Sequence, residues 1–95
     1  MSEKLKNFTS TLNPTKTIQV RVADFPHGLR VFDDVQMVRI KSNGYNLLIM
    51  ADHVPVIGEI NGDVELVLNS DIQTFDNVAA FYMHRDNVLS ILIKD

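Results

Sequence analysis

The sequence contains no cysteine, so disulfide bonds and thiolate metal sites are excluded and the fold depends on burial and hydrogen bonds. It also lacks any apolar run close to the roughly 18 residues that a membrane-spanning helix needs. Residues 1–16 are polar throughout and lack the continuous apolar stretch of a signal peptide. These absences predict a cytoplasmic protein with no transmembrane segment.

Basic residues are scarce, with nine Lys and Arg against twelve Asp and Glu. Three of the lysines lie in residues 1–16 beside a single glutamate, which leaves six basic and eleven acidic residues in residues 17–95. An acidic domain repels the phosphate backbone of nucleic acids. We therefore expect no nucleic-acid binding.

The length of 95 residues suits one hydrophobic core. Residues 1–16 mix polar side chains with isolated apolar ones and show no sustained periodicity. We expect a flexible polar leader there and one β-sandwich domain over residues 17–95. A short helix over residues 3–12 is the alternative, because three apolar residues in it are spaced by three and four.

Strict alternation of apolar and polar residues begins at Thr17, with Ile18, Val20 and Val22 on one face. Turn residues then recur about every 8 to 12 positions. The segments between them, taken as strands, are 18–22, 29–32, 35–41, 45–50, 56–60, 63–68, 72–75, 78–83 and 88–94. This pattern predicts an all-β fold, a β-sandwich or flattened barrel of about seven to nine short, mostly antiparallel strands, without a helix of ordinary length after residue 16.

Three details of the strand pattern can be tested directly. Asn61-Gly62 is the strongest hairpin signal in the chain, because both residues tolerate the positive φ that a tight turn needs. Asp76-Asn77 predicts a further turn between two strands. The nearly continuous apolar run Tyr45 to Met50 predicts a strand that is buried on both faces or lies near the centre of the sandwich.

Histidine and acidic residues lie close together at three points of the sequence. The pairs are Asp24 with His27, Asp52 with His53, and His84 with Asp86. Each pair falls in a separate turn and none shows a familiar metal-ligand spacing. We interpret all three as solvated turn residues, and expect no metal site.

Motifs for covalent or phosphate chemistry are absent from the sequence. No sharp nucleophile turn pairs a serine with a base, and no glycine-rich loop opens a helix. We expect a domain without catalytic residues or cofactor, which is not an enzyme.

A series of short motifs follows a familiar order along residues 18–95. They are Ile18 to Val22, Val31-Phe32-Asp33, Val35 to Ile40, Asn43-Gly44, Leu47 to Met50 leading into His53-Val54-Pro55, Ile60-Asn61-Gly62, Phe81-Tyr82 and Val88 to Ile93. In this order they resemble the N-terminal β-sandwich of the epsilon subunit of F-type ATP synthases. The His-x-Pro loop is the most distinctive of them.

The chain departs from that family at several places. Ala51-Asp52 stands where the family has Pro-Gly, Leu48 stands where it has glycine, and the sequence ends at Asp95 without the C-terminal helical hairpin that regulates hydrolysis. The resemblance implies docking on a gamma-like subunit and the membrane rotor ring, at the periphery of a membrane complex. It implies Asp52, His53 and Pro55 as the candidate interface.

The sequence thus favours a non-catalytic protein-protein interaction domain. The alternative is a stand-alone interaction or homo-oligomeric domain with an unknown partner, unrelated to ATP synthesis. It would use an exposed strand edge or the rim of Leu47, Ile49 and Met50, and the oligomeric state stays open. A ligand-binding barrel or enzyme is a third hypothesis, which requires a pocket with converging polar groups.

Overall fold

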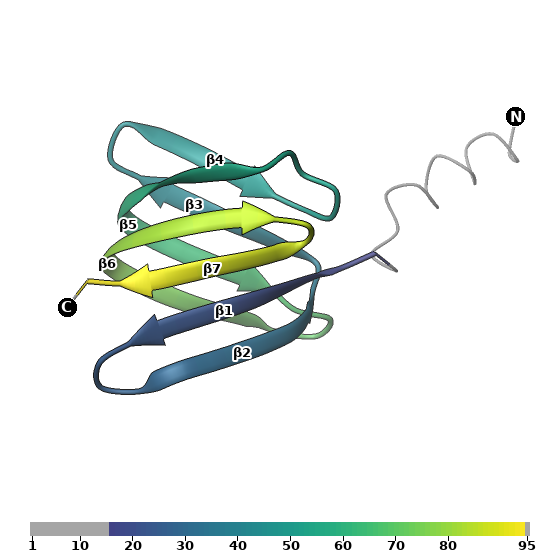
Figure 1. Ribbon diagram of the computed structural model, residues 1–95, viewed down its shortest axis with the longest axis horizontal. Coiled ribbons are helices and arrows are strands. Elements are labelled where there is room, and N and C mark those ends of the chain that lie inside the picture. Colours follow the sequence, from purple (N-terminus) through teal and green to yellow (C-terminus); the bar gives the residue numbers. More distant parts are fainter. Residues whose placement is uncertain (1–15, 95) are drawn as a thin grey trace, which may run out of the picture.

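The computed structural model describes residues 16–94. Every regular element in this range is a β-strand, as the sequence predicts, and seven strands form one mixed sheet (Figure 1). They are β1 (Ile18–Asp24), β2 (Gly28–Val35), β3 (Met37–Ser42), β4 (Tyr45–Ile49), β5 (Val56–Val67), β6 (Ile72–Arg85) and β7 (Val88–Ile93). The predicted leader, apart from Lys16, lies outside the described residues.

The strand order across the sheet is β2-β1-β7-β6-β5-β3-β4. Neighbouring strands are antiparallel except β1 and β7, which run parallel. The sheet has two free edges, at β2 and β4, so it does not close into a barrel. The sequence predicts a β-sandwich or a flattened barrel, and the structure forms the open arrangement.

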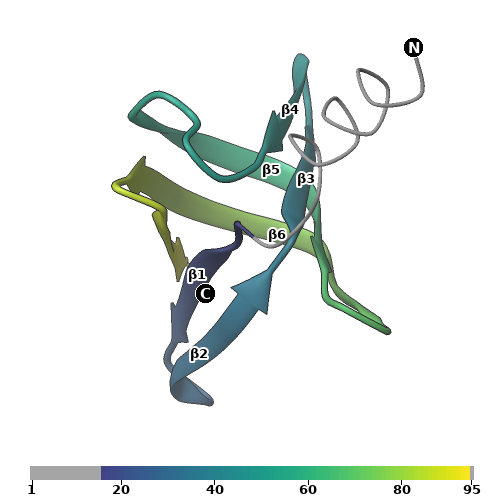
Figure 2. The ribbon, with the colours of Figure 1, turned by 90° about the vertical axis from the view of Figure 1, so that its right-hand side faces the viewer.

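The sheet bends over so that it forms two layers. The two longest strands, β5 and β6, belong to both of them. The first half of β5 pairs with the second half of β6, which continues to β7, β1 and β2. The second half of β5 pairs with the first half of β6 and with β3. Figure 2 shows β5 and β6 crossing from the layer of β1 and β7 to the layer of β3.

Gly62 lies in β5 where the strand passes from one layer to the other. A Cβ atom there would lie 2.0 Å from the carbonyl oxygen of Lys41 in β3, so no other residue fits against this backbone. On β6, an extra residue separates Phe75 from Val78 opposite Val64 and Gly62 of β5. This β-bulge, with Asn77 at a φ of 55°, allows the pair of strands to bend.

The predicted hairpin at Asn61-Gly62 is wrong, because both residues lie inside β5. Gly62 is needed for its missing side chain and does not adopt the positive φ found at Gly28 and Gly44. Asp76-Asn77 is likewise a bulge within β6, so two predicted strands merge into one. The chain reverses at residues 68–71 instead, where the Leu68 amide donates to the Asp71 carbonyl at 2.8 Å.

The core lies between the two layers and is built from alternating residues of all seven strands. Val20 and Leu89 are fully buried, and Ile18, Val22 and Ile91 nearly so, as the alternation of the first and last strands predicts. The other buried apolar residues are Val35, Val38, Ile40, Ile49, Ile60, Val64, Leu66, Ala80 and Tyr82.

The prediction that residues 45–50 form a strand near the centre or buried on both faces is wrong, because β4 is an edge strand with one exposed face. Ile49 is buried and Leu47 packs against the core, whereas Leu48 points outward and is half exposed. The apolar run at residues 45–50 therefore corresponds to an edge strand with one exposed leucine.

Candidate functional site

The predicted interface loop, Asp52, His53 and Pro55, connects β4 to β5. The Asp52 backbone amide donates to the Asn87 side-chain oxygen at 2.6 Å, and the Asp52 carboxylate pairs with Lys16 at 2.6 Å. The bonds from Lys16 and Asn87 lower the pKa of Asp52. The loop is thus tied to the turn between β6 and β7 and to the start of the domain.

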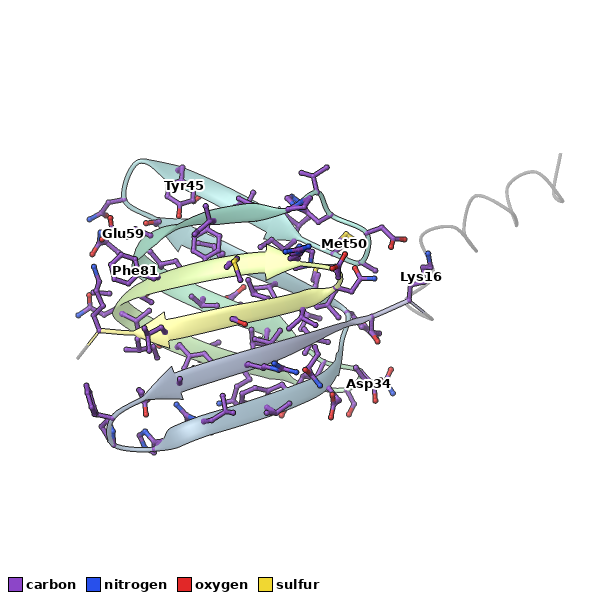
Figure 3. All side chains as sticks on the ribbon, viewed as in Figure 1. Lys16, Asp34, Tyr45, Met50, Glu59 and Phe81 are labelled. Atoms are coloured by element: carbon purple, nitrogen blue, oxygen red, sulfur yellow. The ribbon has the colours of Figure 1, made fainter. Side chains whose placement is uncertain are left out.

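His53 is held within this loop by its own backbone. Its amide donates to the Met50 carbonyl at 3.1 Å, and Nδ1 lies 2.7 Å from the Val54 carbonyl oxygen. Its ring lies edge-on to the ring of His84, with centroids 5.8 Å apart. Figure 3 shows Lys16 and Met50 at the same end of the molecule, which is the end occupied by this loop.

His84 is fully buried near the end of β6, so its interpretation as a solvated turn residue is wrong. Neither ring nitrogen has a hydrogen-bond partner among the described residues. Burial lowers the pKa of His84 and the charge on His53 lowers it further, against the opposing effects of the Val54 backbone and Asp86. Its position in the alternation of β6, in step with Ala80 and Tyr82, is the sequence signal for this burial.

The outward side of the layer formed by β2, β1, β7, β6 and β5 is rich in exposed apolar side chains. We call this surface the apolar face, and define it by Leu29, Val31, Ile57, Phe81, Met83 and Leu92. Each of them is at least about half exposed, and Ile57 is 77% exposed. Monomeric proteins rarely expose a contiguous apolar surface of this kind unless it binds something.

Strand pairing places these side chains in two adjacent rows across five strands. The first row is Ile57, Met83, Ser90, Arg21 and Val31. The second row is Glu59, Phe81, Leu92, Ala23 and Leu29. Because cross-strand neighbours lie about 5 Å apart, the six apolar side chains form one surface that is continuous through Ala23, which lies between Leu92 and Leu29.

The outward side of the other layer carries ion-paired residues beside an apolar row of Met37, Val67 and Ile72, of which Ile72 is half exposed. Arg39 of β3 pairs with Glu65 of β5 at 3.4 Å, and Lys41 lies 3.9 Å from the same carboxylate. Leu48 is the exposed leucine beside Arg39 on this side. Fewer large apolar side chains are therefore exposed on this side than on the apolar face, and ion pairs lie among them.

One end of the apolar face continues onto the hairpin between β1 and β2. Phe25 at the tip is 93% exposed. The Asp24 carboxylate holds the tip, because it accepts the His27 amide at 2.7 Å and pairs with Arg30 at 3.1 Å. Phe25, Leu29 and Leu92 contribute to the wall of one hollow of about 290 Å³, so the tip and the face are contiguous.

The opposite end of the face reaches the predicted interface loop. Pro55, Ile57, Met83 and His84 contribute to a hollow of about 240 Å³. Asp52 and His53 line a separate hollow of about 430 Å³ together with the turn between β6 and β7. Of the three candidate residues, Pro55 is thus the one that adjoins the apolar face.

Polar contacts border the apolar face at Glu59. Lys94 pairs with Glu59 at 2.7 Å and lies 4.3 Å from the centre of the Phe81 ring. The Tyr45 hydroxyl donates to the Glu59 carbonyl and lies 3.2 Å from the Tyr82 hydroxyl. Figure 3 shows Tyr45, Glu59 and Phe81 close together at the end of the molecule opposite Lys16.

Metal coordination finds no support in residues 16–94, where no group of three or more His, Asp or Glu side chains is placed to hold an ion. In the same range, no helix is long and apolar enough to cross a bilayer.

The fold and this surface define an all-β domain with one exposed apolar face. No protein-family model and no curated protein matches its sequence. Among solved structures, it is similar to a chain in the cryo-EM structure of the Tetrahymena thermophila mitochondrial ATP synthase, central stalk and c-ring. The TM-score is 0.68 at 18% identity, over 84% of this chain. The match spans 65% of the Tetrahymena chain, slightly less than two thirds of its length.

This match corrects the resemblance drawn from the sequence. The similar structure is described as the central stalk and c-ring of an ATP synthase, and not as an epsilon subunit. One motif of that series, Ile60-Asn61-Gly62, was interpreted as a hairpin, which the structure does not form. What the comparison supports is the fold, shared with a chain of an ATP synthase structure.

Proposed function

We propose that this chain is a non-catalytic interaction domain of an ATP synthase, and that it docks on another subunit through the apolar face. The observation that carries the proposal is the number of large apolar side chains exposed on the apolar face, which exceeds that on the opposite side, where ion pairs lie among them. The fold shared with a chain of the Tetrahymena ATP synthase structure supports the choice of complex.

The energetics of the face favour a protein partner. Burying an exposed Leu, Ile, Phe or Met side chain stabilises a complex by about 1.5–3 kcal/mol when the burial is complete. Several such side chains in one patch are sufficient for a specific contact of ordinary size. A largely apolar face with one arginine in its interior gives a phosphate backbone few contacts, which agrees with the excess of acidic residues.

The partner proposed is a subunit of the central stalk, and a gamma-like subunit is the specific candidate. The domain would then lie at the periphery of a membrane complex. Asp52, His53 and Pro55 are proposed as a secondary contact, because Pro55 adjoins the apolar face while Lys16 and Asn87 hold Asp52 in place.

Co-purification tests this proposal. An affinity tag on the chain in its native cells is expected to recover ATP synthase subunits, and the chain is expected to migrate with the intact complex on native gels. The substitution Leu92→Lys places a charge in the apolar face, and should release the chain from the complex. Recovery of a stable complex without ATP synthase subunits would contradict the proposal.

Leu48→Lys is the matched control. Leu48 and Leu92 are both outward leucines on strands, 47% and 55% exposed, on opposite sides of the domain. Leu48→Lys should leave the chain in the complex. Equal loss of both variants, with both still folded by circular dichroism, would show that the apolar face has no special role. A change in the size of the free chain with Leu92→Lys would instead favour the homo-oligomeric alternative.

A further inference from the structure

Arg21 stands out on the apolar face because of its surroundings. It is exposed on β1, between Ser90 of β7 and Val31 of β2. Glu59, the other charged residue of the two rows, lies at the end of its row and pairs with Lys94. Arg21 is therefore the one charged side chain in the interior of the face.

No carboxylate within residues 16–94 forms an ion pair with Arg21. Its Nε donates to the Gln19 side-chain oxygen at 2.8 Å, and the Gln19 amide donates to Asp33 at 2.8 Å. These two hydrogen bonds hold the Nε end of the guanidinium group in place. Its two terminal amino groups make no hydrogen bond with the described residues.

A charge in the middle of a docking surface loses its water when the surface is covered. Removing an unpaired guanidinium from water is costly, and a carboxylate in fork geometry offsets that cost through two parallel charge-assisted hydrogen bonds. Arginine is also enriched among the residues that dominate binding at interfaces. A partner that covers Arg21 must therefore supply a carboxylate to pair with it.

We propose that the partner that docks on the apolar face is a different protein chain, and that it places an Asp or Glu carboxylate against Arg21 within an otherwise apolar contact. This inference rests on the proposed function, because it concerns the same face. It adds the chemistry of the partner surface: apolar residues around one acidic side chain.

A second copy of the domain fits this requirement poorly. Two carboxylates lie at the margins of the face: Glu59 pairs with Lys94, and Asp33 accepts one hydrogen bond from the Gln19 side chain. A symmetric pairing about the centre of the face would place the two Arg21 side chains near each other, with carboxylates only at the margins, and like charges repel. The charge pattern thus favours a heterologous partner.

Binding of purified chain to ATP synthase isolated from the same cells tests the inference. Arg21→Gln is expected to weaken binding at least about 30-fold, because it leaves the partner's carboxylate buried and unpaired. Arg39→Gln is the control and should bind like the wild type. Arg39 pairs with Glu65 on the side of the domain opposite the apolar face. Circular dichroism confirms that both variants are folded.

A carbodiimide cross-link identifies the carboxylate. In Arg21→Lys the new amine can condense with a carboxylate in contact with it, forming an amide while the carbodiimide takes up the water lost and becomes a urea. Mass spectrometry then locates the linked peptide. A link to Asp or Glu of another protein is the expected result, and a link to Asp33, within the chain or across two copies, would overturn the inference.

The outcomes separate this inference from the proposed function. If the wild-type chain binds and Leu92→Lys does not, while Arg21→Gln binds normally, the inference is overturned and the proposed function stands. If the wild-type chain does not bind ATP synthase, the proposed function fails and the inference fails with it.

Discussion

The ring of His53 lies edge-on against the ring of His84, 5.8 Å between centroids, and His84 is completely enclosed without a partner for either nitrogen among the described residues. The loop that carries His53 therefore covers a buried neutral imidazole. A proton added to His84 would have no acceptor to satisfy it, and would lie beside a second imidazole.

Stability should fall in mild acid because of His84. Its pKa is lowered in the folded state, while the unfolded chain has the ordinary value of about 6.5. Below that pH the unfolded state binds more protons than the folded state, so the free energy of unfolding decreases until the pH passes the lowered folded pKa. Urea unfolding midpoints between pH 8 and about pH 5 measure the decrease.

The substitution His84→Phe should flatten this pH dependence, because it removes the buried imidazole. His53→Gln should reduce it partly, because the charge on His53 contributes to the shift. An unchanged slope in His84→Phe would assign the acid sensitivity to other groups.

Gly62→Ala should be severely destabilising. The added Cβ would lie 2.0 Å from a backbone carbonyl oxygen of Lys41, which cannot move without separating β3 from β5, so a loss of more than about 3 kcal/mol is expected. Gly58→Ala is the comparison, because its new Cβ would meet the Tyr82 side chain at 2.8 Å and a side chain can shift. Equal unfolding midpoints for the two variants would argue against the close approach at the bend.

Tyr45→Phe removes the hydroxyl that bridges the Glu59 carbonyl and the Tyr82 hydroxyl. A loss of about 1 kcal/mol is expected, the usual worth of one hydrogen bond. Burial raises the pKa of Tyr82 well above its ordinary range and the bond to Tyr45 raises it further, so the variant should ionise at lower pH. Ultraviolet absorbance titration detects this change, and an identical titration curve would contradict the contact.

Phe25→Ala should separate binding from stability. Phe25 is almost fully exposed, so its loss should change the free energy of unfolding by no more than about 0.5 kcal/mol. If the hairpin tip is an anchor of the docking surface, affinity for the complex should fall by about 2 kcal/mol, or roughly 30-fold. Full retention of affinity would limit the docking surface to the two strand rows.

The fold class could be predicted because alternation is a local property. In β1 the sequence positions of Ile18, Val20 and Val22 determine which side of the strand is apolar, and the structure buries all three. The bend in β5 could not be predicted in this way. Asn61-Gly62 satisfies the rules for a tight turn, and only the closeness of Lys41 in another strand shows that the glycine is needed for packing.

The candidate site was harder to predict than the fold. Asp52, His53 and Pro55 do lie in one loop, and their role as an interface stays a prediction. The apolar face was not anticipated, because Leu29, Met83 and Leu92 each look like ordinary strand residues on their own. They become one surface only through the parallel pairing of β1 with β7, which no local pattern indicates.

Thiol accessibility tests the account most directly, because the chain has no cysteine of its own. Leu92→Cys and Leu48→Cys place one thiol on each outward side of the domain, and a maleimide reagent labels them in the free chain and in the chain bound to ATP synthase. The account predicts equal labelling of both in the free chain, and protection of position 92 alone in the complex. Continued labelling at position 92 with protection at position 48 would contradict it.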